Sequence, residues 1–374
     1  MNHRNSNIRN QEGSGMLPNL PPGSILMKIR DYLEESNIPT FRFQQLVNSL
    51  QHGREKFEEI NELPKTLREQ LSEYFGQTPL PLKIVKEQSA EQVRKILFET
   101  RSGAQIETVM SQYRAGWTSM CVSSQSGCGL GCSFCATGTI GLVRNLTEDE
   151  ICGQIFHPHW QALPDSIAFM GMGEALMNPH FFSSLQVLTA AGYGGISSRR
   201  ITVSTVGVAP KLEQLVKEYP QVNITLSVHS PFSEQRTEII PLEKRYPLTE
   251  NLSILDRYTN TVRRKVYLAY LLIKNVNDSN EHLNALVKMI KSCSRPKLFH
   301  VSVIPYNDSF KMDSSYQAPA MEHVLKFVSQ LKQHGVHATR RQQFGASIDA
   351  ACGQLYASNL SQDMDKPMER KKTV

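Results

Sequence analysis

Long apolar runs are missing from this chain of 374 residues. No stretch approaches the roughly 18 to 20 apolar residues that a membrane-spanning helix requires. The first 24 residues are rich in Asn, Gly and Pro and lack the apolar centre of a signal peptide. The sequence therefore predicts a soluble, cytoplasmic protein, and with 40% hydrophobic residues the chain can still bury a large core.

A strong charge of one sign is also missing. The 41 basic residues are nearly balanced by 35 acidic ones, which gives a formal charge of +6 and a pI near 8.8. Three pairs would suit a surface that faces phosphates: Arg199–Arg200, Arg263–Arg264 and Arg340–Arg341. Scattered solvated charge explains the same composition, so charge alone leaves nucleic-acid binding open.

An even set of cysteines, as a disulfide framework needs, is absent too. The chain has seven cysteines, and most of them crowd between Cys121 and Cys152. An odd, clustered set favours metal binding or thiol chemistry in a reducing compartment and argues against secretion.

The order of predicted elements indicates an α/β protein. Apolar residues repeat at helical spacing three times before Gly76, which predicts three short amphipathic helices. Six β-branched and aromatic runs follow, each succeeded by a helix-like segment: "WTSMCVSS", "SIAFM", "RITVS", "VNITLSV", "KVYLAYLL" and "KLFHVSVI". This alternation predicts parallel strands joined by helices, and six units suit a partial (βα)6 barrel better than a closed eightfold one.

The same patterns divide the chain into five segments. We expect a disordered extension, a small helical RNA-binding domain, a linker with a β extension, the partial barrel, and a flexible tail. Their predicted ranges are, in that order, 1–24, 25–78, 79–105, 106–357 and 358–374.

Polar and sulfur-bearing residues follow the predicted strands at their carboxyl ends, where ligands gather in such folds. The cysteine triplet follows the first strand, and "GMGE", which ends at Glu174, follows the second. Ser204 ends the third strand, "SVH" (Ser227 to His229) ends the fourth, and Asn307 follows the sixth. We expect these groups to converge on one face.

The stretch "GCGLGCSFCATG" places Cys128, Cys132 and Cys135 within eight residues as CxxxCxxC, with no fourth ligand in step. Iron–sulfur clusters usually take four thiolates, and structural zinc takes four Cys or His ligands. Three thiolates on a four-iron cluster leave one iron open for a substrate. A zinc site completed by one further residue is the alternative, and the candidates are Cys121, Cys152, His157 and His159.

With Phe134 directly before its last cysteine, the triplet resembles the radical S-adenosylmethionine superfamily. In that superfamily a [4Fe-4S] cluster binds S-adenosylmethionine through its open iron and cleaves it to a 5′-deoxyadenosyl radical. The "GMGE" stretch also fits, since a glycine-rich segment there contacts the methionine end of the cofactor, although GxG alone is weak as a dinucleotide-binding motif.

Longer phrases narrow the resemblance to the RlmN/Cfr family of ribosomal RNA adenine methyltransferases, over residues 25 to 357. They are "CVSSQSGCGLGCSFCATGTIGLVRNLTEDEI", "FMGMGEALMNP", "STVGVAP", "LSVHSP", "VIPYN" and "IDAACGQLY". Ala175, "QFG" at Gln343 to Gly345, "LSVHSP" and "GQLY" look more like the Cfr branch. That branch methylates carbon 8 of an adenine in the peptidyl-transferase centre of 23S rRNA and confers antibiotic resistance. Methylation of carbon 2, as in the housekeeping branch, is the alternative.

The resemblance implies a role for two more cysteines. Cys352 in "AACGQL" would accept a methyl group as S-methylcysteine, since a thiolate is a good methyl acceptor. Cys121 would release the protein–RNA crosslink by forming a disulfide, and Glu107 matches a proton acceptor. A non-catalytic, zinc-stabilised RNA-binding protein and a radical enzyme with another substrate are the rival interpretations.

The family match further implies residues that contact S-adenosylmethionine: Gly173, Glu174, Ala175, Ser204, Ser227, Val228, His229 and Asn307. The implied partners are 23S rRNA before full ribosome assembly and a reducing electron donor such as flavodoxin. Cys152 and Cys293 lack a motif and are expected to be structural. Ser347 stands where the family usually has Asp, which would alter how the Cys352 segment is held.

Overall fold

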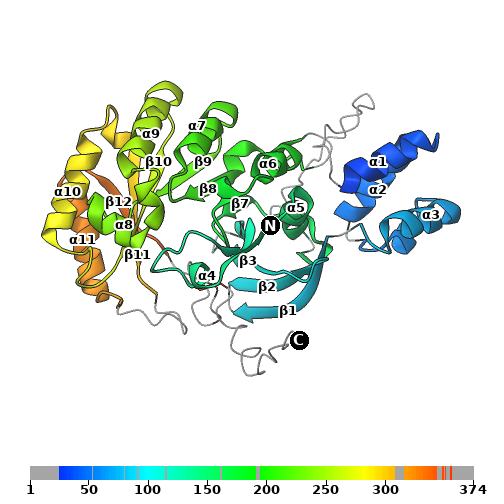
Figure 1. Cartoon of the computed structure of the whole chain (residues 1–374), viewed down its shortest axis with the longest axis horizontal. Coiled ribbons are helices and arrows are strands. Elements are labelled where there is room, and N and C mark those ends of the chain that lie inside the picture. The colour runs from blue at the N-terminus through cyan, green and yellow to red at the C-terminus, as the bar shows by residue number, and fades with distance from the viewer. Residues whose placement is uncertain are drawn as a thin grey trace, which may run out of the picture.

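The computed structural model describes residues 25–52, 54–79, 81–90, 92–113, 116–160, 162–190, 194–307, 316–342, 348, 350 and 354–355. A large sheet runs through the molecule, and three helices form a separate unit at one end (Figure 1). Cys352 and Ser347 lie outside the described residues, as do the extension before residue 25 and the tail after residue 355.

The central sheet holds ten strands in the order β1-β2-β3-β4-β7-β8-β9-β10-β11-β12. The first four pair antiparallel, and every pair from β4 to β12 is parallel. The strands are β1 (Leu82–Ala90), β2 (Val93–Thr100), β3 (Gln105–Gln112), β4 (Thr118–Val122), β7 (Ser166–Phe169), β8 (Ile201–Thr205), β9 (Asn223–Ser227), β10 (Val266–Leu272), β11 (Phe299–Pro305) and β12 (His337–Arg340). The sheet does not close, because β1 and β12 lie at its opposite edges.

All six predicted parallel strands are present, and they confirm the α/β class and the partial barrel. A seventh parallel strand, β12, was not predicted, because only Ala338 of its four residues is buried and no apolar run marks it. The predicted β extension is an antiparallel sheet that continues through β3, so it runs past the expected boundary at residue 105.

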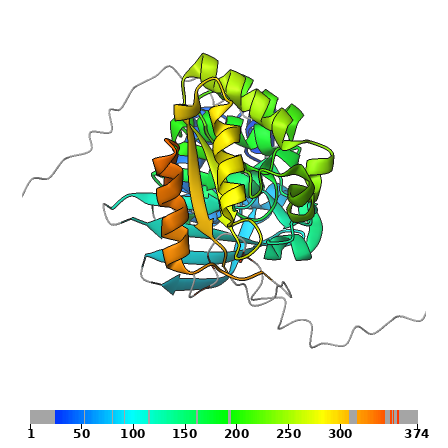
Figure 2. The ribbon, with the colours of Figure 1, turned by 90° about the vertical axis from the view of Figure 1, so that its left-hand side faces the viewer.

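The helices after the crossover strands lie on the outer face of the sheet (Figure 1). In Figure 2, viewed from the end that holds β11 and β12, α10 and α11 cover the last strands. These helices are α5 (Glu148–Phe156), α6 (Phe181–Thr189), α7 (Ala209–Glu218), α8 (Ser233–Ile239), α9 (Leu248–Val262), α10 (Asn280–Lys291) and α11 (Met321–Gln333). Among the described residues, no helix has the length and apolar content needed to cross a membrane.

Side chains alternate between two faces along each parallel strand. In β8, for example, Ile201 and Val203 are fully buried against the helices, whereas Thr202 and Ser204 point to the opposite face and are only partly buried. We call that opposite face the inner face. It is the concave side of the open barrel, and its polar content shows that the barrel interior is not simply filled with aliphatic side chains.

The three predicted N-terminal helices are confirmed as α1 (Ile25–Glu35), α2 (Phe41–Gln51) and α3 (Lys65–Phe75). The last one ends at Gly76, whose φ of +83° is a left-handed conformation that favours glycine. The rings of Tyr32 and Tyr74 lie 4.7 Å apart between α1 and α3. The backbone N–H of Ile25 donates to Asp149 Oδ2 of α5 at 2.5 Å, which joins the helical unit to the barrel.

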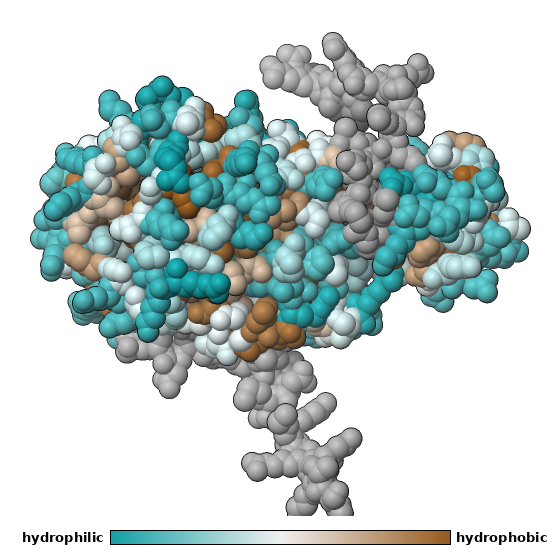
Figure 3. Space-filling view, turned by 45° about the horizontal axis from the view of Figure 1, so that its top comes forward, coloured by the Kyte–Doolittle hydropathy of each residue, from teal (hydrophilic) through white to brown (hydrophobic). Residues whose placement is uncertain are grey.

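The visible surface is mostly hydrophilic, with hydrophobic residues in small separate patches (Figure 3). Such a surface is ordinary for a protein in water, where single exposed apolar residues are common.

Candidate active site

The cysteine triplet lies on a loop held by its own two-stranded sheet, β5 (Gln125–Cys128) and β6 (Gly141–Asn145), with α4 (Ala136–Thr139) between them. Gly127 has a φ of +70°, and a Cβ there would meet the carbonyl oxygen of Gly141 at 2.0 Å. The hairpin can therefore close this tightly only with glycine at that position. Within the loop, the N–H of Cys135 donates to the carbonyl of Cys132 at 3.2 Å.

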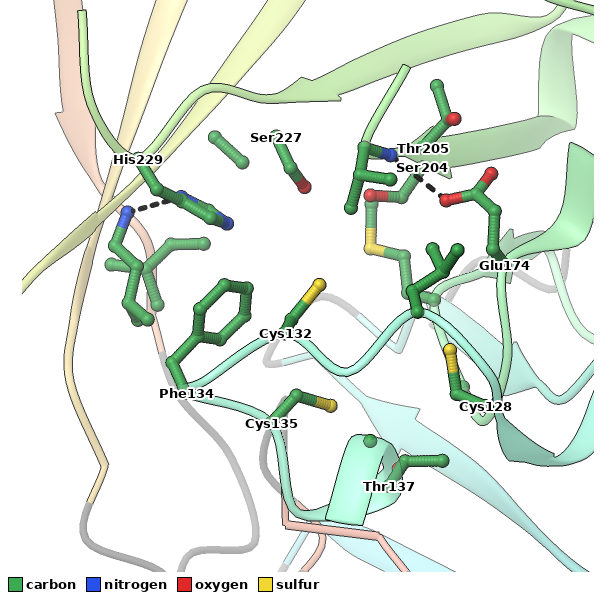
Figure 4. Close-up of a pocket in the computed structure, with 18 of the residues that line it drawn as sticks. Cys128, Cys132, Phe134, Cys135, Thr137, Glu174, Ser204, Thr205, Ser227 and His229 are labelled. Atoms are coloured by element: carbon green, nitrogen blue, oxygen red, sulfur yellow. Dashed lines mark hydrogen bonds between the residues drawn. The ribbon is translucent and has the colours of Figure 1, made fainter. Parts of the chain in front are cut away.

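The loop covers a cavity at the carboxyl ends of the parallel strands, with an open volume of about 1100 Å³ including its mouth. Figure 4 shows the side chains of Cys128, Cys132 and Cys135 along one side of this space and Glu174, Ser204, Ser227 and His229 along the other. We call it the cysteine cavity. The predicted convergence at the strand ends is therefore present.

Burial makes the thiols poor thiolates by themselves. Burial, together with the neighbouring cysteines, raises the pKa of Cys128 to about 11 and raises the pKa of Cys132 well above its ordinary value. Positively charged metal offsets both effects, since metal binding deprotonates a coordinating thiol. In the described part of the chain, no three Cys, His, Asp or Glu side chains converge on one point that a single metal ion could occupy. Three thiols spread along one cavity wall fit a cluster with several irons better than one zinc ion.

Three of the four residues proposed to complete a zinc site lie away from the cysteine cavity. Cys152 is buried in α5 and faces the carbonyl of Ser184, and its thiol pKa is raised by burial and by Asp149 and Glu148. His157 is buried beside Phe98, and His159 pairs with Glu87 at 2.6 Å. None of these three lines the cysteine cavity.

Glycines let the "GMGE" segment lie directly on the strand ends. A Cβ on Gly171 would approach the carbonyl oxygen of Val122 to 2.7 Å, and one on Gly173 (φ +93°) would approach Gln125 Cβ to 2.5 Å. The next residue, Glu174, is 4% exposed, and its carboxylate accepts the N–H groups of Val206 at 2.9 Å and Leu176 at 3.3 Å. Burial raises the pKa of Glu174, and the hydrogen bonds it accepts oppose this. A cationic group of a ligand would favour its ionised form.

His229 sits at the end of β9 with a φ of +57°. Its Nδ1 accepts the N–H of Leu271 at 2.9 Å, so the proton of the neutral ring is on Nε2, which faces the cavity (Figure 4). Burial, helped by the charge of nearby Arg236, lowers the pKa of His229 to about 3. The ring of Phe134 packs edge-on against it with centroids 4.8 Å apart. His229 is therefore a neutral hydrogen-bond donor toward the cavity.

Six of the eight residues predicted to contact S-adenosylmethionine line the cavity: Gly173, Glu174, Ser204, Ser227, His229 and Asn307. The other two, Ala175 and Val228, do not. Ala175 is a buried residue at the start of a 3-10 turn, and Val228 is fully buried, with its N–H bonded to the carbonyl of Ala269 at 2.9 Å.

Arg236 is a supporting residue that no sequence motif marks. This arginine is almost fully buried and forms an ion pair with Glu243. Its guanidinium also donates to the carbonyls of Val206, Ser227 and Val228, at 2.7 to 3.0 Å. Because these carbonyls follow β8 and β9, Arg236 fixes the two strand ends that carry Ser204, Ser227 and His229. Arg236 follows β9 by nine residues, but this spacing is not a recognised motif and does not predict a supporting role.

A second cavity adjoins the first and contains Cys121, so we call it the Cys121 cavity. Its open volume is about 760 Å³, and Met170, Ile304, Asn307, Arg341 and Leu355 line both cavities. Glu107 lies on the same face of β3 as the lining residue Val109, but it is fully buried, and its Oε1 is 3.2 Å from Lys95 Nζ. Its predicted role as proton acceptor stays a prediction.

Comparisons with known proteins agree with this geometry. Residues 122–289 match the model of the radical SAM superfamily. The chain is 46% identical over 334 residues to "Ribosomal RNA large subunit methyltransferase Cfr" of Staphylococcus aureus, which covers 88% of this chain and 96% of that protein. The protein of the same name from Bacillus velezensis is 45% identical, with 89% and 96% covered. The crystal structure of a radical SAM methyltransferase from Sphaerobacter thermophilus superposes with a TM-score of 0.81 at 34% identity, covering 89% of this chain and 97% of that one.

Proposed function

Because this chain belongs to the family of Cfr ribosomal RNA large subunit methyltransferases, we propose that it methylates carbon 8 of an adenine in the peptidyl-transferase centre of 23S rRNA. The observation that carries the proposal is the junction of the two cavities. One cavity holds the cysteine triplet, the other holds Cys121, and Leu355 lines both. Such a modification would confer resistance to antibiotics that bind there.

The cofactors of this radical SAM chain are a [4Fe-4S] cluster and S-adenosylmethionine, which together supply a carbon-centred radical when bound. Cys128, Cys132 and Cys135 would hold three irons and leave the fourth open. We assign the recognition of S-adenosylmethionine to Glu174, Ser204, Ser227, His229 and Asn307. The buried carboxylate of Glu174 suits a cationic group, and the Nε2–H of His229 donates a hydrogen bond.

The proposed methyl carrier, Cys352, lies outside the described residues, but the chain around it can be followed. Ala350 lines the Cys121 cavity, and Leu355 lines both cavities. Thr137, in α4 next to the triplet, donates its hydroxyl to the carbonyl of Leu355 at 3.4 Å. The described residues on either side of Cys352, Ala350 and Leu355, therefore both line these cavities, and this supports its assignment.

The proposed steps use the two thiols in turn. The Cys352 thiolate takes a methyl group from one S-adenosylmethionine and releases S-adenosylhomocysteine. The 5′-deoxyadenosyl radical from a second S-adenosylmethionine would take a hydrogen atom from this S-methyl group, and the resulting carbon radical would bond to the adenine carbon and give up one electron to the oxidised cluster. The Cys121 thiolate then attacks the Cys352 sulfur, which forms a disulfide and breaks the sulfur–carbon bond, and the released methylene group gains a proton while the ring carbon loses one. Cys121 or Glu107 would accept that ring proton.

Nucleoside mass spectrometry with chromatographic standards tests the proposal. We would compare 23S rRNA from cells that lack the housekeeping enzyme, with and without this protein. We expect 8-methyladenosine with the natural chain and none with Cys352→Ala. Appearance of 2-methyladenosine alone would move the modification to carbon 2, and absence of any methylated adenosine would contradict rRNA adenine methylation.

A further inference from the structure

The inner face of the barrel has two parts. Its carboxyl half forms the two cavities, and we call its amino half the amino-end tier. The tier consists of the inner-facing residues that begin six neighbouring strands: Ser166, Thr202, Asn223, Tyr267, His300 and His337. Each lies on the same strand face as residues that line the cavities, such as Ala269 and Leu271 on β10. In a closed barrel this level is packed with branched aliphatic side chains. Here all six residues are polar or carry a hydroxyl, and all are partly or fully exposed.

Three of these residues form a row of flat rings. Tyr267 lies opposite His300 in the register of β10 and β11, and His300 lies opposite His337 in that of β11 and β12. The ring centroids of Tyr267 and His300 are 5.4 Å apart, and Tyr267 is 37% exposed. His300 is positioned by Thr339, whose hydroxyl is 2.9 Å from its Nε2. Exposed flat rings next to one another are suited to stacking on other flat groups.

Hydrogen-bonding groups border the ring row. Arg264 donates to Asn223 Oδ1 at 2.8 Å, which holds its guanidinium at the amino end of β9. At the far side of the tier, the indole of Trp117 is 45% exposed and reaches the hydroxyl of Ser166 at 3.3 Å. The tier therefore combines stacking surfaces, amide and hydroxyl groups and a fixed cation.

The charge around the tier is positive. Burial lowers the pKa of His300, and the nearby basic groups Lys265, His337 and Lys332 lower it further. The pairs Arg199–Arg200 and Arg263–Arg264 also precede strands of the tier, β8 and β10. By contrast, residues 25–78 of the helical unit hold seven Lys and Arg against nine Asp and Glu, a formal charge of −2. Phosphates would therefore be attracted to the amino-end tier more than to the helical unit.

We propose that the amino-end tier binds the single-stranded rRNA beside the target adenine, stacking bases on the row of Tyr267, His300 and His337 and placing phosphates near Arg264 and Lys265. This inference rests on the proposed function. Sequence-specific RNA recognition commonly uses unstacked bases on aromatic side chains. Tyr267 and Leu271 lie four residues apart on the same strand face, a distance of about 13 Å. RNA held at the tier is thus within a short distance of the base that enters the cavities.

RNA affinity of the full-length protein with its cluster, measured without oxygen, tests this inference. The probe is a labelled oligoribonucleotide that contains the target adenine and its single-stranded neighbours, and fluorescence anisotropy gives Kd. We expect Tyr267→Ala and His300→Ala each to raise Kd by roughly tenfold, the size of one lost stacking contact. Tyr267→Phe keeps the ring and should bind like the natural chain. Leu325→Ala, on the outer face of α11, is the control for loss of an exposed apolar side chain.

The outcomes separate this inference from the proposed function. If the natural chain binds and methylates rRNA while Tyr267→Ala binds equally well, the inference is wrong and the proposed function stands. If the natural chain neither binds nor methylates rRNA, the proposed function fails and the inference with it. A third outcome would assign the tier to the chain's own tail in place of RNA. In that case deletion of residues 358–374 lowers the Kd for RNA, and Tyr267→Ala in the full-length chain lowers it equally. This result would overturn the inference.

Discussion

At the residue scale, burial by itself does not distinguish the cysteines proposed as cluster ligands from those expected to be structural. Burial raises the pKa of Cys132 and of Cys152 alike. The difference lies in their neighbours, because Cys132 lies beside Cys128 and Cys135 along one wall of the cysteine cavity, whereas Cys152 faces a backbone carbonyl in the core. A thiol beside other thiols suits the proposed role as a cluster ligand, and a thiol against a buried carbonyl suits the expected structural role.

We predict that Cys132→Ala loses most of the bound iron and acid-labile sulfide, because the two remaining thiolates cannot hold the cluster. Cys293→Ala is the matched control, since Cys293 is partly buried at the end of α10 and contacts Met289. It should keep iron and sulfide at the level of the natural chain. Iron and sulfide analysis of the protein prepared without oxygen gives the answer, and equal iron in both variants would contradict the assignment of the triplet.

A buried arginine presents a different case at the same scale. We predict that Arg236→Ala lowers the free energy of unfolding by about 3 to 5 kcal/mol, because Glu243 then remains charged and buried without its partner. The carbonyls of Val206, Ser227 and Val228 lose their donor as well. Urea denaturation measures the effect. Arg257→Ala, which breaks the exposed pair with Glu213, should cost less than about 1 kcal/mol, and a similar loss in both variants would argue against the bracing role of Arg236.

At the element scale, the first turn of α5 is capped by residues of the barrel and also contacts α1 of the helical unit. Thr147 and Glu150 form a capping box, and Arg144 binds Glu150 through two hydrogen bonds of 2.9 Å. Asp149 lies between Glu148 and Glu150 in the first turn of α5, and its carboxylate accepts the N–H of Ile25 at the start of α1. Burial raises its pKa to about 6; Glu148 raises it, while that hydrogen bond, Lys28 and Arg101 lower it. The contact between the helical unit and the barrel therefore includes a titrating group.

The raised pKa of Asp149 has a defined effect on stability. Because the folded state binds the proton more tightly than the unfolded state, the contribution of this group to stability falls as pH rises from about 4 to about 6 and is then constant. We predict that Asp149→Asn, which keeps an oxygen acceptor for Ile25, is more stable than the natural chain by on the order of 2 kcal/mol at pH 7. The two proteins should differ little at pH 4. Unfolding curves at both pH values test this, and a constant difference would contradict it.

At the scale of the whole molecule, positive charge is distributed unequally between the helical unit and the barrel. The helical unit carries a formal charge of −2 while the whole chain carries +6, so the excess of positive charge lies outside that unit. The basic pairs noted in the sequence lie on the barrel, two of them at the amino ends of its strands. Charge therefore supports RNA binding by the basic pairs of the barrel more than by the helical unit, which was predicted to be an accessory RNA-binding domain.

We predict that Arg199→Ala/Arg200→Ala weakens rRNA binding and reduces its salt dependence, because phosphate contacts release counterions in proportion to their number. Lys65→Ala in the helical unit is the control, since its side chain is exposed and its ion pair within the described part of the chain is with Glu69, one turn away. Affinities measured from about 50 to 200 mM salt give both slopes. A larger loss of rRNA affinity with Lys65→Ala than with the double variant would indicate that the helical unit binds the RNA.

The sequence by itself determined the six parallel strands, the three N-terminal helices and the convergence of most predicted site residues on one cavity. Periodicity reports which side of an element is buried, and parallel strands bring their carboxyl ends together, so no further information was needed. Tertiary structure alone decided the contribution of Arg236, the short strand β12, the exclusion of Ala175 and Val228 from the cavity lining, and the row of Tyr267, His300 and His337. Each depends on pairing or packing between segments far apart in the chain, and a local pattern of residues does not record that register.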